Sequence, residues 1–127
     1  MEKLLAFHFD ETELFQLRQL AAAHKIRLEA VEATDYKQSL EALASGRKNP
    51  LTEPFTGEVP EENLLLLCDF SEKRLDKLLF SLRKSPVQVD FKAVLTPNNK
   101  QWNVLRLLLE LKAEKAAYER QRRTPGN

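Results

Sequence analysis

The chain has 127 residues, of which 43% are hydrophobic and 31% charged, a composition typical of a folded protein and not of a disordered one. Its 20 basic and 19 acidic residues give a net charge of +1, which argues against nucleic acid or an anionic membrane as partner. The single cysteine, Cys68, excludes an internal disulfide and multi-cysteine zinc sites. We find neither a secretory signal nor an apolar membrane span, and expect a cytoplasmic protein without metal or cofactor.

The first elements in chain order are a strand and a helix. Residues 3–9 form a short apolar run, as expected of a strand covered on both faces. A helix follows, because Asp10 and Glu13 have the spacing of a capping box. Residues 26–33 alternate apolar and charged side chains and predict a second strand. Asp35 and Gln38 predict the cap of a short helix that ends near Gly46.

Residues 47–62 form a connector with three prolines and one glycine. This composition predicts a segment without regular structure, and its length exceeds that of most loops. We expect it to wrap around the domain or to move, with Leu51 and Phe55 as its anchors to the surface.

The second half repeats the series. Residues 63–70 predict another buried strand, and Ser71 is placed to cap the next helix, whose inward stripe consists of Leu75, Leu78, Leu79 and Leu82. Residues 87–95 predict the fourth strand. Asn98 and Gln101 predict the capping box of a long last helix.

We therefore expect one domain over residues 1–120, made of a first half (1–46), the connector (47–62) and a second half (63–120), with a frayed tail at 121–127. Adding 61 to a residue number carries Phe9 to Phe70 and Leu17 to Leu78. This agreement fits an ancestral duplication and equally fits two unrelated units of the same layout.

Alternating strands and helices predict an α/β fold with a small, mostly parallel four-stranded sheet and helices on both faces. In the simplest arrangement all strands are parallel, the order is 2-1-3-4, and the long helices of the two halves lie on opposite faces. A split ferredoxin-like fold is the alternative, but the hairpin that it needs is missing.

Such sheets bind ligands at the topological switch point, where the connections from two adjacent strands run in opposite directions. In the expected order this point lies between the first and third strands. The residues that follow these strands are therefore a candidate pocket. Cys68 beside His8 could form a reactive thiolate, although a lone cysteine in an apolar strand is usually inert. The carboxylates and the absence of glycine in these loops disfavour phosphate, and Asp10 and Asp69 are better explained as solvated caps than as ligands of a divalent cation. The complete candidate pocket is His8, Asp10, Cys68, Asp69, Ser71, Thr96 and Asn99.

Two further surfaces could bind partners. The last helix is apolar around much of its circumference, so Trp102, Leu107 and Leu109 are candidates for a homodimer interface. The helix over residues 72–84 and the C-terminal tail carry basic side chains that could touch nucleic acid, a weaker hypothesis given the net charge: Lys73, Arg74, Lys77, Arg83, Lys84, Arg120, Arg122 and Arg123.

Two motifs carry a resemblance. One runs from Cys68 and Phe70 into Ser-Glu-x-Arg-Leu-Asp-x-Leu-Leu (71–79), and the other is Lys-Ala-Val-Leu-Thr-Pro-x-Asn-Lys-x-Trp (92–102). The chain resembles a small bacterial family known only as domain of unknown function 3783, closely over residues 63–115 and only in layout before them. The resemblance implies no activity and transfers no catalytic residue.

The function expected from these features is a non-enzymatic binding or interaction module. One alternative is a small ligand-binding protein or enzyme that uses the loops around Cys68 and His8. The other is weak nucleic-acid contact through residues 72–84 and the tail.

Overall fold

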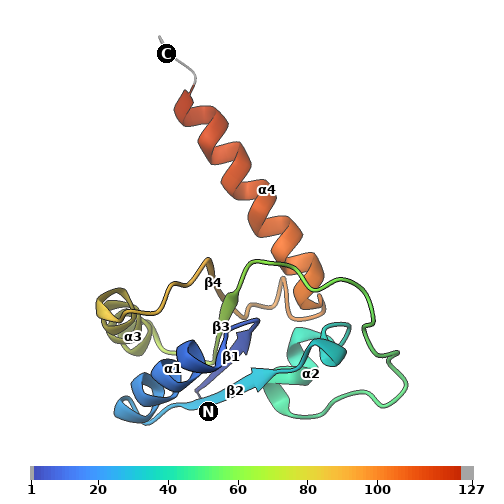
Figure 1. Ribbon diagram of the computed structural model, residues 1–127, viewed down its shortest axis with the longest axis horizontal. Helices are drawn as coiled ribbons and strands as arrows, with labels where there is room; N and C mark the ends of the chain where they lie inside the picture. Colours follow the sequence, from blue (N-terminus) through green and yellow to red (C-terminus); the bar gives the residue numbers. More distant parts are fainter. Residues whose placement is uncertain (1, 124–127) are drawn as a thin grey trace.

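The computed structural model describes residues 2–123 and contains one mixed four-stranded sheet (Figure 1). Its strands are β1 (Lys3–Phe7), β2 (Arg27–Val31), β3 (Leu64–Cys68) and β4 (Phe91–Val94). They lie in the order β2-β1-β3-β4, and the outer pairs β1–β2 and β3–β4 are parallel. The predicted α/β class, strand order and mostly parallel character are confirmed.

The expectation that β1 and β3 run parallel is wrong. They are antiparallel, with Lys3 opposite Cys68 and Phe7 opposite Leu64. An apolar run such as "LLLLC" has no direction in its pattern, so periodicity could not reveal the error. The loops that follow β1 and β3 therefore lie at opposite ends of the sheet.

The connector explains why β3 is antiparallel to β1. The connector carries the chain to the far end of the sheet, where the carbonyl oxygen of Glu61 lies 3.1 Å from Nδ1 of His8, just after β1. Along the way Asn49 exchanges two 2.9 Å hydrogen bonds with the side chain of Gln38. Phe55 anchors the connector as predicted, through stacking of its ring on Tyr36, whereas Leu51 is 89% exposed and does not anchor it.

The first helix of each half, α1 (Glu11–Ala23) and α3 (Glu72–Lys84), packs on the same face of the sheet. Leu17 of α1 and Leu78 of α3 are fully buried in one apolar cluster with alternate strand residues such as Leu4. The prediction of one long helix on each face is therefore wrong. It depended on parallel β1 and β3, because right-handed crossovers in antiparallel halves put both helices on one side.

The other face is covered by α2 (Leu40–Ser45) and the first turns of α4 (Val104–Arg123). A 3-10 turn (Ala33–Asp35) precedes α2. The cap of α2 is Ser39, whose Oγ accepts from the N–H of Ala42, and not the predicted Asp35. The helix ends as predicted at Gly46, whose φ of 75° suits glycine.

The halves repeat each other in structure. Adding 61 carries β1 onto β3 and α1 onto α3 at both ends, and it carries the helix cap Asp10 onto Ser71. Adding 64 carries the start of β2 onto that of β4 and the first residue of α2 onto that of α4. Because Leu5 is opposite Leu66, its own counterpart, a pseudo-twofold axis passes through this pair. The repeated layout is thus present in three dimensions.

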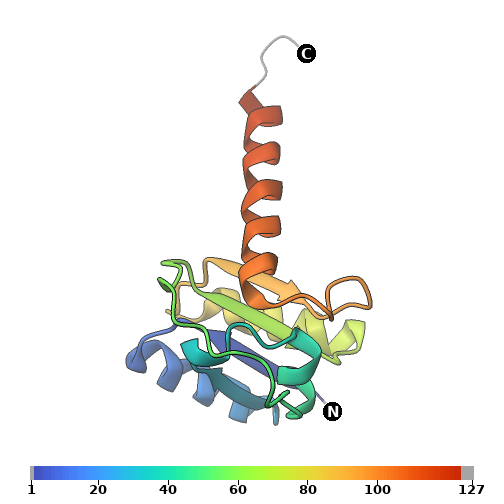
Figure 2. The same ribbon diagram turned by 90° about the vertical axis from the view of Figure 1, so that its right-hand side faces the viewer.

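The last helix stands away from the rest of the molecule (Figures 1 and 2). The inward side of its first turns is buried through Val104, Leu107 and Leu108, and Leu111 is its last apolar residue packed against the core. We call residues 112–123 the α4 extension. The predicted frayed tail is helical through Arg123, and residues 124–127 lie outside the described part. No helix within residues 2–123 is long and apolar enough to cross a membrane.

The C-terminal end of α1 is closed by a left-handed residue. Lys25 has φ 58°, the N–H of Ile26 donates to the carbonyl of Ala21 at 2.8 Å, and the N–H of Lys25 donates to that of Ala22 at 3.0 Å. These two bonds form a Schellman motif, in which the left-handed position usually holds glycine.

We predict that Lys25→Gly raises the free energy of unfolding by about 1 kcal/mol, because glycine adopts this φ without a Cβ clash. Urea denaturation followed by circular dichroism measures the change. Lys25→Ala is the matched control and should give no gain, since alanine keeps the Cβ. Equal stabilisation by both variants would contradict the explanation.

Candidate functional site

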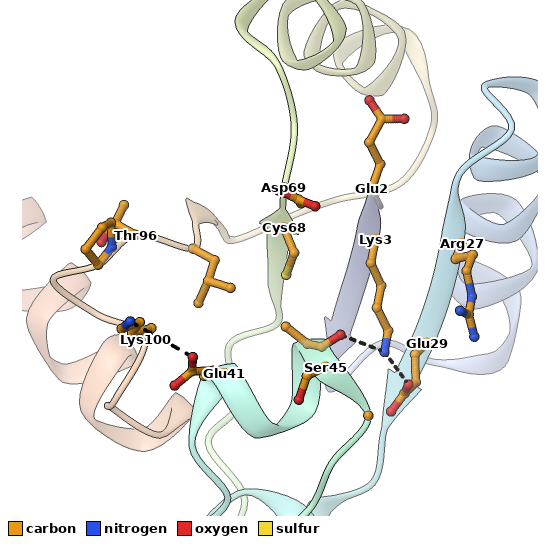
Figure 3. A pocket seen from close by; sticks show the side chains of 14 residues that line it. Glu2, Lys3, Arg27, Glu29, Glu41, Ser45, Cys68, Asp69, Thr96 and Lys100 are labelled. Atoms are coloured by element: carbon orange, nitrogen blue, oxygen red, sulfur yellow. Dashed lines mark hydrogen bonds and ion pairs between the residues drawn. The ribbon is translucent and has the colours of Figure 1, made fainter.

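A cavity of about 670 Å³ opens at the end of the sheet where β1 begins and β3 ends (Figure 3). All four strands and α2 contribute to its wall, either directly or through the residues next to their ends. It is large enough for a small-molecule ligand. Of the predicted pocket it contains Cys68, Asp69 and Thr96.

Lys3 is buried in the wall of this cavity. Its Nζ forms a 2.9 Å ion pair with Glu29 and donates to the carbonyls of Leu43 and Ala44 at 3.1 and 3.3 Å. Those carbonyls belong to the last turn of α2, where the helical hydrogen-bond ladder ends and the carbonyls carry partial negative charge. The Leu43 carbonyl also accepts from the N–H of Gly46 at 3.3 Å. Lys3 thereby ties β1 to both β2 and α2, and all three of its donors are used.

Cys68 is the residue opposite Lys3 and is 2% exposed. Burial raises the pKa of its thiol to about 12, an effect that the positive charge of Lys3 opposes and the negative charge of Asp69 strengthens. A nucleophilic cysteine needs the opposite environment, one that stabilises the thiolate. In this position Cys68 behaves as a small core side chain.

Asp69 has a left-handed backbone, with φ 66°. Such strain in a non-glycine residue often marks a functional site. Here, however, its counterpart His8 has φ 64° at the equivalent point after β1. The conformation therefore belongs to the strand-to-helix connection of both halves and is no sign of chemistry at one of them.

Thr96 and Asn99 form a closed turn. The Asn99 Oδ1 accepts from the N–H of Thr96 at 2.9 Å, and the Thr96 Oγ1 accepts from the N–H of Asn99 at 3.1 Å. Asn99 is buried and also donates to the carbonyl of Val94 at 3.0 Å, so it faces the protein and is not part of the cavity wall. Only Thr96 of this pair reaches the cavity.

The predicted capping box at Asn98 and Gln101 does not start the last helix, because α4 begins at Val104. The side chain of Asn103 accepts there from the N–H of Arg106 at 3.0 Å. Carbonyls of residues 100 and 102 instead accept from the first two N–H groups of α2 at 3.0 and 2.8 Å. The loop thus caps α2, a tertiary role that spacing in the sequence does not reveal.

The remaining predicted pocket residues do not line the cavity. His8 and Asp10 follow β1 at the opposite end of the sheet, about 16 Å away for strands of five residues. Asp10 forms the predicted capping box of α1 with Glu13, and Ser71 caps α3 through a 3.3 Å bond to the N–H of Arg74. The predicted Cys68–His8 pair required β1 and β3 to be parallel. Because they are antiparallel, this premise is wrong.

The three residues predicted as an interaction surface have different environments. Leu107 is buried in the core, whereas Trp102 is half-buried with the Arg106 guanidinium 4.3 Å from its ring. Leu109 is 69% exposed.

Sequence reasoning missed two sets of polar contacts made by side chains of α3. Nε2 of His24 lies 2.9 Å from the Ser81 Oγ, an arrangement that resembles part of a hydrolytic site. Ser81 lies inside α3, where backbone N–H groups are used by the helix and leave no oxyanion hole. Arg74 forms two hydrogen bonds with Glu2, at 2.8 and 2.7 Å, and donates to the His24 carbonyl at 2.7 Å. The contacts with His24 join α3 to the end of α1, and the contact with Glu2 joins α3 to the residue before β1. None of these pairs stands out by sequence spacing.

Within residues 2–123, no group of three or more histidine, cysteine or acidic side chains is arranged to hold a metal ion.

Residues 63–118 match the model of a family described as a domain of unknown function, DUF3783. This span, just under half of the chain, contains β3, α3, β4 and most of α4, and it confirms the resemblance carried by the motifs at 68–79 and 92–102. No curated protein and no solved structure matches the chain. The family description supplies no activity.

We predict that Lys3→Met lowers the free energy of unfolding by about 2–4 kcal/mol, because Glu29 and two helix carbonyls lose a charged partner. Urea denaturation measures the loss. Lys37→Met is the matched control, because Lys37 is exposed and forms a single long ion pair, 4.0 Å, with the exposed Glu53. This change should alter the free energy of unfolding by less than about 0.5 kcal/mol. Similar losses in both variants would contradict this role.

We predict that iodoacetamide alkylates Cys68 at least a hundredfold more slowly in the native protein than in urea. With a pKa of about 12 the thiolate fraction near pH 8 is about 10⁻⁴. Mass spectrometry of timed samples gives both rates. Rapid labelling of the native protein would show instead that Cys68 is a reactive thiol.

Proposed function

We propose that the protein is a non-enzymatic binding module that presents the α4 extension to a protein partner. One observation carries the proposal: the extension has no counterpart in the first half. The helix α2 is equivalent to the start of α4, yet it ends at Gly46, the position that corresponds to Glu110. One half thus completes its share of the fold without such an extension.

The physics of helices supports a partner for this segment. An isolated helix shorter than about 12–15 residues is marginal in water, and helices in proteins are mostly stabilised by packing. Side chains of residues 112–122 are exposed except for the half-buried Ala117, and Tyr118 is 62% exposed. Exposed tyrosine and arginine side chains are favoured anchors of protein interfaces.

The ligand-binding alternative has its best support in the cavity beside Lys3. Most charged groups of that cavity are already paired within the chain: Lys3 with Glu29, Glu2 with Arg74, and Glu41 with Lys100 at 4.0 Å. A charged ligand would have to compete with these partners. The ion pairs around the cavity therefore favour a role in stabilising the fold over a role in binding a ligand.

The nucleic-acid alternative depends on the basic side chains of residues 72–84 and of the tail, where the Arg122 guanidinium lies 5.9 Å from the centre of the Tyr118 ring. Arg74 is bound to Glu2 and to the His24 carbonyl, and Lys84 lies over the Phe80 ring at 4.4 Å. With a net charge of +1, little excess basic charge is left for phosphate contacts.

The proposal is tested by placing a photo-crosslinking phenylalanine analogue at position 118 of the full-length protein, in the cells that naturally make it. We predict that ultraviolet light yields protein adducts from this probe. The same probe in place of Phe80, which is 53% exposed on α3, is the matched control and should yield none. Adducts from position 80 alone, or none from 118, would overturn the proposal.

A further inference from the structure

A second cavity, of about 460 Å³, lies between α4 and the turns that precede β3 and β4. The turns contribute the acidic residues Glu61, Glu62 and Asp90, and the half-buried ring of Phe91 lies beside them. From α4 the lining residues are Lys112, Lys115, Ala116 and Glu119.

These four α4 residues form a strip along one face of the extension, because they are spaced i, i+3, i+4 and i+7. The strip has the basic Lys112 and Lys115 at the end near the sheet, the small Ala116 next, and the acidic Glu119 at its far end. Lys112 forms a 3.1 Å ion pair with Glu62, and the Lys115 ammonium lies 5.8 Å from the centre of the Phe91 ring.

We propose that the occupant of this cavity is the α4 extension of a second copy, in antiparallel orientation about a twofold axis near Ala116. The inference rests on the proposed function and names its partner. Antiparallel pairing places Lys112 of each copy opposite Glu119 of the other, whereas parallel pairing would oppose like charges. The small Ala116 side chains at the centre let the two helices approach closely.

The charge pattern selects a second copy over other partners. The two ends of the strip, Lys112 and Glu119, are complementary to their own reverse, while Lys115 then lies opposite the small Ala116. A twofold interface requires such self-complementarity, because each residue pair occurs twice. The same orientation brings Arg122 of one copy toward the acidic turn 61–62 of the other. The exposed ion pairs are individually weak, so the dimer is salt-sensitive and dissociates at low concentration.

The test is sedimentation equilibrium of the full-length protein from about 10 µM to about 1 mM, a range suited to a small, weak interface. The mass is expected to rise from 14.7 kDa toward twice that value, and less so at high salt. Ala116→Arg should raise the dissociation constant at least about tenfold, and Ala113→Arg, the same change at an exposed position outside the strip, less than about twofold.

A second matched pair separates charge from bulk. Glu119→Lys should weaken the dimer because it opposes Lys112 of the partner, whereas Glu114→Lys, on another face, should not. Circular dichroism identifies any variant that fails to fold.

A mass fixed at 14.7 kDa, or equal weakening by the variants at positions 113 and 116, would overturn the inference. The proposed function would survive that result if the probe at position 118 captures a different protein, and it fails only if that probe captures none.

Discussion

The antiparallel contact between β1 and β3 organises the whole structure. All ten residues of the two strands are buried, and the pair joins the two halves across the pseudo-twofold axis at Leu5 and Leu66. Because both faces of this pair are covered, each strand contributes side chains to two apolar clusters. Their direction decides that α1 and α3 share one face and α2 and α4 the other. It also decides which loops meet in a cavity.

Polar groups at the ends of the elements are satisfied by neighbours from distant parts of the chain. The carbonyls that end α2 accept from Lys3, and the N–H groups that begin it donate to the loop at 100–102. Among described residues, no buried side-chain nitrogen or oxygen lacks a hydrogen-bond partner. These contacts explain why charged residues such as Lys3 and polar ones such as Asn99 lie inside: they complete helix ends and turns, where a buried unpaired group would be costly.

Local chemistry made much of this fold predictable, since the caps Asp10 and Ser71 and the end at Gly46 follow from short-range spacing. Strand order followed from the alternation of strands and helices. Strand direction did not, because the signal lies in how residues 47–62 bind the surface, through contacts such as Gln38 with Asn49. The candidate pocket inherited this error, which removes His8 and Asp10 from it. Ser71 and Asn99 are missing from the cavity for another reason, because each bonds within its own cap or turn, so three of the seven residues line it. The cap of α4 at Asn103 was missed for a related reason. Asn98 has an equally good local capping pattern, and the hydrogen bonds of residues 100 and 102 to α2 make Asn103 the cap instead.

The length of the connector determines whether one chain can supply all four strands of the sheet. It must be long enough to reach from Gly46, beside the start of β1, to Leu64, opposite the end of that strand. A shortened connector could not span this distance within one molecule, yet β1 would still present the same edge to a β3. Under that constraint each half would complete its sheet with the other half of a neighbouring molecule, and the chain would form domain-swapped assemblies. The length of residues 47–62 thus keeps the two halves of each sheet in a single chain.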